Sequence, residues 1–149
     1  MAGSRSWRWR NVPVPEPHLA GLVVGLLLQR RWPRQLSGRP AVRIGGVALL
    51  AAGTAVVVWA TASAGSDVLK EPGRLVTGGP YAHSRNPMYV GWTLMYVGAA
   101  AARDAAWPLL LLPGVAAATH RQVRREEAAL AARFGAGFEA YATRVRRYL

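Results

Sequence analysis

The chain has 149 residues, of which 52% are hydrophobic, and it carries a formal net charge of +12. This length fits one compact domain and leaves no room for a separate nucleotide-binding fold. The absence of cysteine excludes disulfides, cysteine-rich zinc sites and thiolate nucleophiles. Apolar blocks alternate with arginine clusters, which predicts a single all-α domain over residues 1–149, built as a polytopic membrane helical bundle.

The first apolar block in chain order is the weakest candidate for a membrane span. Pro13, Pro15 and Pro17 punctuate its start, and a signal peptide is the rival interpretation. The block ends in a basic segment, residues 29–31, without a small-x-small cleavage site, so we expect it to be retained as a short or tilted span. With three later blocks it completes a prediction of about four spans, at Val14–Leu28, Ile44–Ala64, Met88–Ala102 and Ala105–Thr119.

The second block fits a membrane span best. About 20 apolar residues without a charge are enough to cross the roughly 30 Å hydrocarbon core. The third and fourth blocks are shorter and are separated only by Arg103 and Asp104, which predicts a tight helical hairpin. Small residues such as Gly91, Gly98 and Gly114 are expected to bring these two helices together.

The residues after the fourth block predict an amphipathic C-terminal cytoplasmic helix. We expect a helix over Thr119–Phe134, a break at Gly135 and Gly137, and a second helical stretch over Phe138–Tyr148. Apolar residues recur every three or four positions beneath an arginine-rich face. This face is suited to anionic lipid headgroups. The apolar stripe consists of Leu130, Phe134, Phe138 and Tyr141.

The distribution of Lys and Arg predicts the orientation of the four-span bundle. Thirteen of them fall on the side of the two termini and the 65–87 loop, and six fall on the other side. This excess places both termini and that loop in the cytoplasm. The first span alone favours the opposite orientation, with three basic residues before it and five after it.

Two motifs carry the chemistry. Residues 78–91, GGPYAHSRNPMYVG, set a polar, aromatic and basic loop against the start of an apolar helix, and Glu126 and Glu127 follow the predicted hairpin. The stretch LVTGGPYAHSRNPMYVGW resembles the signature of the isoprenylcysteine carboxyl methyltransferase and phospholipid methyltransferase family. The acidic pair followed by FGAGFEAYATRV resembles the second signature of that family. The resemblance is specific from about residue 66 to residue 147.

The resemblance implies a methyltransferase that binds S-adenosylmethionine at the cytoplasmic membrane face, within about residues 66–149. It implies an acceptor that is lipid-like or a small hydrophobic molecule arriving from the bilayer. The sulfonium of this cofactor is an activated electrophile, so no metal is required. The cofactor contacts implied are Gly73, Arg74, Leu75, Val76, Tyr81, Arg85, Asn86, Pro87, Met88, Tyr89, Glu126 and Glu127.

Spacing within the second signature makes Glu126 the expected cofactor ligand and Glu127 a structural partner. Two positions depart from the family pattern. Asn86 replaces the usual histidine and cannot carry a proton, and Gln122 replaces an arginine that meets an acceptor carboxylate. An amine, hydroxyl or thiol acceptor therefore stays open, with Gln122, Arg121 and Arg125 as acceptor-side candidates. His83 is expected to be a polar loop residue.

Other function classes compete with methyl transfer. A membrane reductase that uses NADPH is one, because related helical reductases resemble these methyltransferases in their C-terminal region. An acidic pair would repel the extra phosphates of that cofactor. A noncatalytic lipid-binding membrane scaffold is the second. Nucleic-acid binding is not expected, because the arginines mostly flank apolar spans, where topology and headgroup contact account for them.

Overall fold

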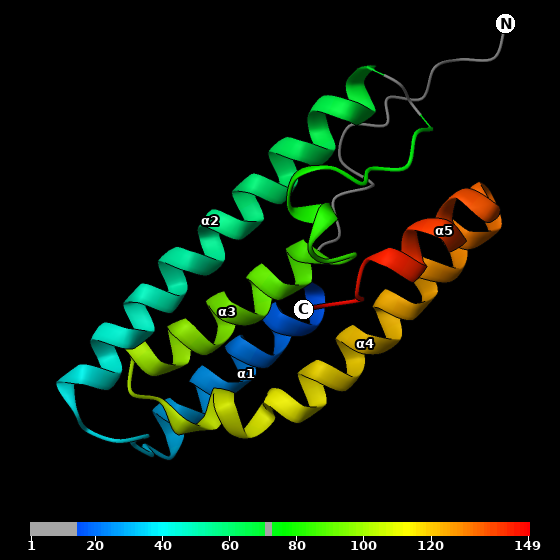
Figure 1. Ribbon diagram of the computed structural model, residues 1–149. Coiled ribbons are helices and arrows are strands. Elements are labelled where there is room, and N and C mark those ends of the chain that lie inside the picture. The colour runs from blue at the N-terminus through cyan, green and yellow to red at the C-terminus, as the bar shows by residue number, and fades with distance from the viewer. Residues whose placement is uncertain (1–14, 71–72) are drawn as a thin grey trace, which may run out of the picture.

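The computed structural model describes residues 15–70 and 73–149, and every element in this part of the chain is a helix. Helices α1 to α4 run alongside one another, while η1 and α5 gather towards one end (Figure 1). The predicted all-α fold is confirmed. The elements in chain order are α1 (Glu16–Arg31), α2 (Pro40–Lys70), the 3-10 turn η1 (Gly79–Ala82), α3 (Pro87–Ala102), α4 (Ala106–Phe134) and α5 (Ala136–Arg144).

One described helix has the length and composition to cross a membrane. It is the Pro40–Gly65 part of α2, with a mean hydropathy of 2.0, and it contains the second predicted span. Helices α1 and α3 have 16 residues each, fewer than the roughly 20 that a perpendicular crossing needs. By these criteria the described residues support one span, where the sequence predicted four.

Glycines on both helices bring α2 and α3 into backbone contact. A Cβ at Gly46 would lie 2.3 Å from a backbone nitrogen of α3, and one at Gly53 would lie 2.6 Å from the carbonyl oxygen of Gly91. Gly98 faces α2 in the same way. The predicted contact of Gly91 and Gly98 with the following helix is therefore wrong. Gly114 has no described atom within 4 Å of its would-be Cβ.

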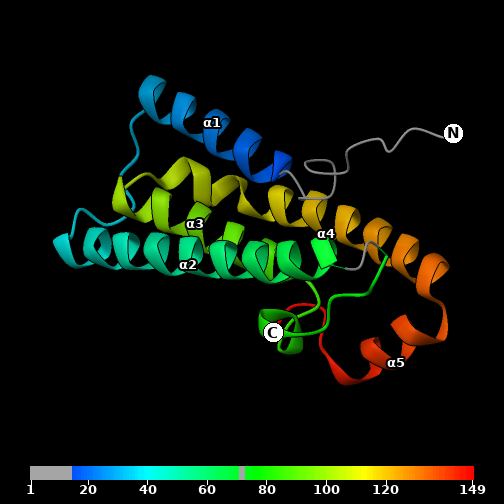
Figure 2. The same ribbon diagram turned by 90° about the horizontal axis from the view of Figure 1, so that it is seen from above.

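The second close pair is α1 with the first half of α4, which lies beside the α2–α3 pair (Figure 2). Gly25 lies against the backbone of Pro108, and Gly21 lies against the side chain of Val115. Tyr96 of α3 is buried at this seam and donates its hydroxyl to the Pro108 carbonyl at 2.6 Å. Helix α1 starts at Glu16 and continues to Arg31, beyond Leu28, the predicted end of the first span. The predicted start, Val14, lies outside the described residues.

Asp104 connects the α1–α2 loop with the α3–α4 turn, at the end of the bundle farthest from η1. Its carboxylate accepts hydrogen bonds of 2.9 Å from the backbone N–H groups of Ser37 and Gly38, and Arg43 forms an ion pair with it at 3.7 Å. These backbone donors lower the pKa of Asp104, and Arg43 adds to the effect. Its φ of 52° is the one positive value among described non-glycine residues. The loop before α2 is thereby tied to the turn between α3 and α4.

Helix α4 is continuous over 29 residues, so the predicted fourth span and the predicted tail helix are one element. Residues 115–134 contain neither glycine nor proline and are rich in alanine, arginine and glutamate, which favour helix. Pro108 falls in the first turn, where proline is tolerated. Pro113 lies inside the helix without ending it, so the apolar half of α4 in the bundle and the charged half beyond it form one continuous helix.

The chain breaks at Gly135, as predicted, with a positive φ of 49°. Gly137 lies inside α5, so a second break there is wrong. The last helix ends at Arg144, not at Tyr148, because Val145 adopts extended backbone angles. The final residues turn back towards α4, where polar side chains bind them.

Candidate functional site

A pocket of about 440 Å³ lies between the C-terminal half of α4 and the loop that precedes α3. This volume is within the roughly 300–1,000 Å³ typical of small-molecule sites. Ala64 near the end of α2, loop 73–76 and the side chains of α5 complete the walls. The lining residues are Ala64, Gly73, Arg74, Leu75, Val76, Tyr81, Arg85, Asn86, Met88, Tyr89, Glu126, Glu127, Ala129, Leu130, Arg133, Phe134, Phe138 and Tyr141.

The signature loop, residues 78–86 before α3, is held against α2 by a glycine that cannot be replaced without strain. Gly79 has a φ of 61°, and a Cβ there would lie 2.6 Å from Ser63 Oγ. Pro80 follows in the 3-10 turn and is buried. Pro87 opens α3, where its fixed φ and missing N–H suit the first helical turn. The two prolines therefore bound the segment that enters the pocket.

Glu126 is presented to the pocket by hydrogen bonds from two helices. Tyr89 of α3 donates its hydroxyl to Glu126 Oε1 at 2.7 Å. Gln122, one turn earlier on α4, donates its Nε2 to the same oxygen at 3.4 Å. Tyr89 is only 2% exposed, so the carboxylate has a fixed partner at the pocket wall. Tyr89 and Glu126 both line the pocket.

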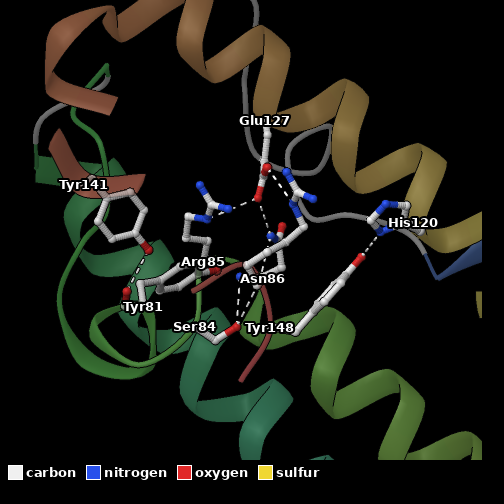
Figure 3. A network of polar contacts seen from close by, with 9 residues as sticks. Tyr81, Ser84, Arg85, Asn86, His120, Glu127, Tyr141 and Tyr148 are labelled. Carbon is white, nitrogen blue, oxygen red and sulfur yellow. Dashed lines mark hydrogen bonds and ion pairs between the residues drawn. The ribbon is translucent and has the colours of Figure 1, made fainter. Parts of the chain in front are cut away.

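Glu127 is instead held in a charge-compensated network (Figure 3). Asn86 donates its Nδ2 to Glu127 Oε1 at 3.0 Å, and Arg147 donates its Nε to Glu127 Oε2 at 2.9 Å. Arg85 forms an ion pair with the same carboxylate, with Nε 3.4 Å from Oε1. Glu127 is 7% exposed, and two guanidinium groups balance its buried charge. Each oxygen of the Glu127 carboxylate therefore has a partner within the protein.

The C-terminal segment contacts the residues of the site through hydrogen bonds that the sequence did not predict. The Arg147 carbonyl accepts a hydrogen bond from Asn86 Nδ2 at 3.1 Å and another from Ser84 Oγ at 3.4 Å. Tyr148 places its hydroxyl 3.0 Å from His120 Nδ1 on α4. The available signal was the cluster of arginines at residues 144–147, which begins at the end of the second signature. That signal indicates a family resemblance but not the partners of its residues.

An aromatic wall closes the other side of the pocket. Tyr141 donates its hydroxyl to the Tyr81 carbonyl at 2.7 Å, and the Phe138 ring meets the Tyr141 ring edge-to-face with centroids 6.3 Å apart. Burial raises the pKa of Tyr81 to about 12, with the charges of Tyr141 and Glu126 adding to the effect. Burial also raises the pKa of Tyr141 to about 12. Both phenols are therefore neutral hydrogen-bond donors at physiological pH.

The structure brings together all the predicted cofactor-site residues except Pro87, which is buried at the start of α3 and does not line the pocket. Among the acceptor-side candidates, Gln122 contacts Glu126. Arg121 and Arg125 are exposed on α4 and lie outside the pocket lining. His83 is exposed, as expected for a polar loop residue.

The fold and the pocket define a helical protein with a cavity of the size that small ligands occupy and an apolar helix able to cross a membrane. The family model described as phospholipid methyltransferase matches residues 41–137, from the start of α2 to the start of α5. The chain therefore belongs to the phospholipid methyltransferase family, which indicates a membrane-associated methyltransferase that acts on lipids. No curated protein and no solved structure matches the chain.

Proposed function

We propose that the chain is an S-adenosylmethionine-dependent methyltransferase whose acceptor is lipid-like or a small hydrophobic molecule. The observation that carries this proposal is the Tyr89–Glu126 hydrogen bond of 2.7 Å at the wall of the pocket. It fixes one carboxylate beside aromatic side chains, while its neighbour Glu127 is fully engaged elsewhere. A ligand with a cationic group, hydroxyls and an aromatic ring has complementary partners in such a site.

The residues around the pocket fit the parts of this cofactor. Glu126 would accept hydrogen bonds from its hydroxyl or ammonium groups. Tyr81, Phe138 and Tyr141 would offer aromatic surface to its adenine ring, and the backbone of loop 73–76 would offer polar groups. When bound, the cofactor supplies a methyl group that its sulfonium has already activated for transfer.

The protein side of the reaction consists mainly of positioning and exclusion of water. Asn86 carries an amide where the family has a histidine, so it holds Glu127 and moves no proton. Glu127 itself is tied by two guanidinium groups. The rate advantage would come from aligning the acceptor with the methyl group in a site that the C-terminal half of α4 and α5 shield from solvent.

Gln122 bears on the class of acceptor. Its neutral amide contacts Glu126 at the position where carboxyl methyltransferases of the family carry an arginine. Arg121 and Arg125 are exposed and do not restore that positive charge beside Gln122, although Arg74 and Arg133 line the pocket. We therefore infer an amine, hydroxyl or thiol acceptor in preference to a carboxylate.

We further propose that α1, α3 and the first half of α4 lie in the membrane beside α2. Large apolar side chains project from α1 and α2, including Leu19, Val23, Leu27, Ile44 and Val58, each at least half exposed. A lipid environment explains this surface better than water does. The excess of Lys and Arg around the pocket end supports a cytoplasmic site and cytoplasmic termini.

Calorimetry on the detergent-solubilised protein tests the cofactor assignment. S-adenosylmethionine and S-adenosylhomocysteine should bind to the wild type, and Glu126→Gln and Tyr89→Phe should each weaken binding by roughly tenfold. Arg124→Ala, an exposed change on the same helix, is the matched control and should bind like the wild type. A folded wild type that binds neither adenosyl ligand refutes the proposal.

An NADPH arm separates the reductase alternative. Arg74 and Arg133 both line the pocket, and neither has an ion-pair partner among the described residues. A phosphate in the pocket would therefore meet these two guanidinium groups as well as the acidic pair. NADPH binding without adenosyl binding would identify a reductase, and binding of neither would leave the membrane scaffold.

A further inference from the structure

The last residues of the chain form a strap across the site. After α5 ends at Arg144, residues 145–149 run in extended and irregular conformation back to the signature loop and α4. Arg85 donates its backbone N–H to the Arg146 carbonyl at 2.9 Å. Tyr148 reaches His120 on α4. The strap therefore connects the segment before α3 to the helix that carries the acidic pair.

Arg147 makes the central contacts of this strap, through both its backbone carbonyl and its side chain. Its carbonyl accepts from Asn86 Nδ2, and its guanidinium donates to Glu127. The same Asn86 Nδ2 also donates to Glu127, so the three residues form a closed triangle of hydrogen bonds. Arg147 therefore contributes both to the orientation of Asn86 and to the charge balance of Glu127.

Removing the Arg147 side chain would leave Glu127 with Arg85 as its remaining cation. The Arg85 Nε lies 3.4 Å from Oε1 and makes no hydrogen bond there, whereas the Arg147 Nε is at 2.9 Å from Oε2. A buried carboxylate that loses a charge-assisted hydrogen bond must move towards water or recruit another cation. Either movement displaces the pocket wall, because Glu127, Asn86 and Arg85 all line it.

We propose that Arg147 is a positioning residue for the cofactor pocket, acting through Glu127 and Asn86. This proposal rests on the proposed function, because it assigns the strap a role in binding the adenosyl cofactor. Under this proposal the two glutamates of the acidic pair have different roles. Glu127 anchors the strap and the signature loop, and Glu126 is left to contact the ligand.

Calorimetric binding of S-adenosylhomocysteine to full-length variants tests this role. Arg147→Ala should weaken binding by about tenfold, the change expected when one charge-assisted hydrogen bond is lost. Arg144→Ala is the matched control, because Arg144 is exposed and its guanidinium bonds the Ala140 carbonyl within α5. It should bind like the wild type.

A double variant distinguishes positioning from a general loss of structure. Arg147→Ala combined with Glu127→Gln removes the uncompensated charge, so the two effects should be non-additive and binding should recover in part. Purely additive losses would overturn the positioning role. If Arg147→Ala does not fold, Arg147→Gln replaces it, and wild-type binding by that folded variant likewise overturns the proposal.

The outcomes separate this proposal from the proposed function. Wild-type binding that Arg147→Ala retains in full overturns the positioning role alone. A wild type that binds no adenosyl ligand overturns the proposed function and the positioning role with it. Weakened binding in Arg147→Ala, with recovery in the double variant, supports both.

Discussion

Replacing Gly46 with alanine should destabilise the bundle, whereas the same change at the adjacent Gly45 should not. A Cβ at Gly46 would lie 2.3 Å from one backbone atom of α3 and 2.8 Å from two others. Backbone atoms cannot rotate away as a side chain can, so α2 and α3 must separate. Gly45 lies on the same helix with no described atom within 4 Å of its would-be Cβ.

The size of the effect follows from the cost of overpacking. Inserting a methyl group into close-packed structure costs about 1–3 kcal/mol, which corresponds to a Tm decrease of roughly 2–12 °C in a chain of this size. Gly45→Ala removes only the conformational freedom of a helical glycine, so it should leave Tm unchanged or raise it by a few degrees. A decrease in Tm is therefore expected for Gly46→Ala and none for Gly45→Ala.

Thermal unfolding in one detergent, followed by the fluorescence of the six tryptophans, measures both variants against the wild type. Equal Tm values for Gly46→Ala and Gly45→Ala would refute the backbone contact between α2 and α3. Binding of S-adenosylhomocysteine at low temperature provides a second readout. It should survive in Gly45→Ala and weaken in Gly46→Ala, because α3 carries Tyr89 into the pocket.

Three further predictions concern loops and the pocket wall. Unfolded tyrosine ionises near pH 10.0, while folded Tyr81 and Tyr141 keep their protons to about pH 12, so stability should fall as pH rises through this window. Tyr141→Phe should reduce that slope in a series of Tm values, and an unchanged slope would contradict the assignment. Because backbone donors lower the pKa of Asp104, its contribution is present above pH 3.8 and lost as pH falls. Asp104→Asn should lower Tm near neutral pH and flatten the acid side of the curve. Gly79→Ala, at a positive φ of 61°, should cost about 1–2 kcal/mol, while Gly78→Ala at ordinary φ should be close to neutral in the same melts.

Much of the architecture was accessible from the sequence because it depends on local pattern. Apolar blocks and helix-favouring residues predicted where helices lie, and the break at Gly135 was predicted from glycine alone. Apart from the helix ends, the main error concerns which helices meet. Gly91 and Gly98 were assigned to the next helix in the chain, but they face α2, because the spacing of small residues shows that a helix has a close partner without saying which one.

The candidate site shows the same limit at the level of single side chains. Tyr89 and Glu126, which are 37 residues apart in two different motifs, come together at the pocket. The resemblance did not place Arg147 or Ser84, because their contacts arise only once α5 ends early and the chain folds back. If α5 had continued to Tyr148, as predicted, its helical path would have taken Arg147 away from Glu127. The early end of α5 at Arg144 depends on tertiary contacts and could not be predicted from the sequence pattern.

The continuity of α4 imposes a phase relation between the bundle and the pocket. Val115, buried against α1, and Glu126, facing the pocket, lie on one rod, and each residue advances that rod by about 100°. A single residue inserted between them would keep both regions helical and yet turn the acidic pair roughly a quarter of a turn away from Tyr89 and Asn86. An insertion of seven residues would nearly restore the angle but would move the pair about 10 Å along the axis. The number of residues between the two regions is thus constrained as tightly as their identity.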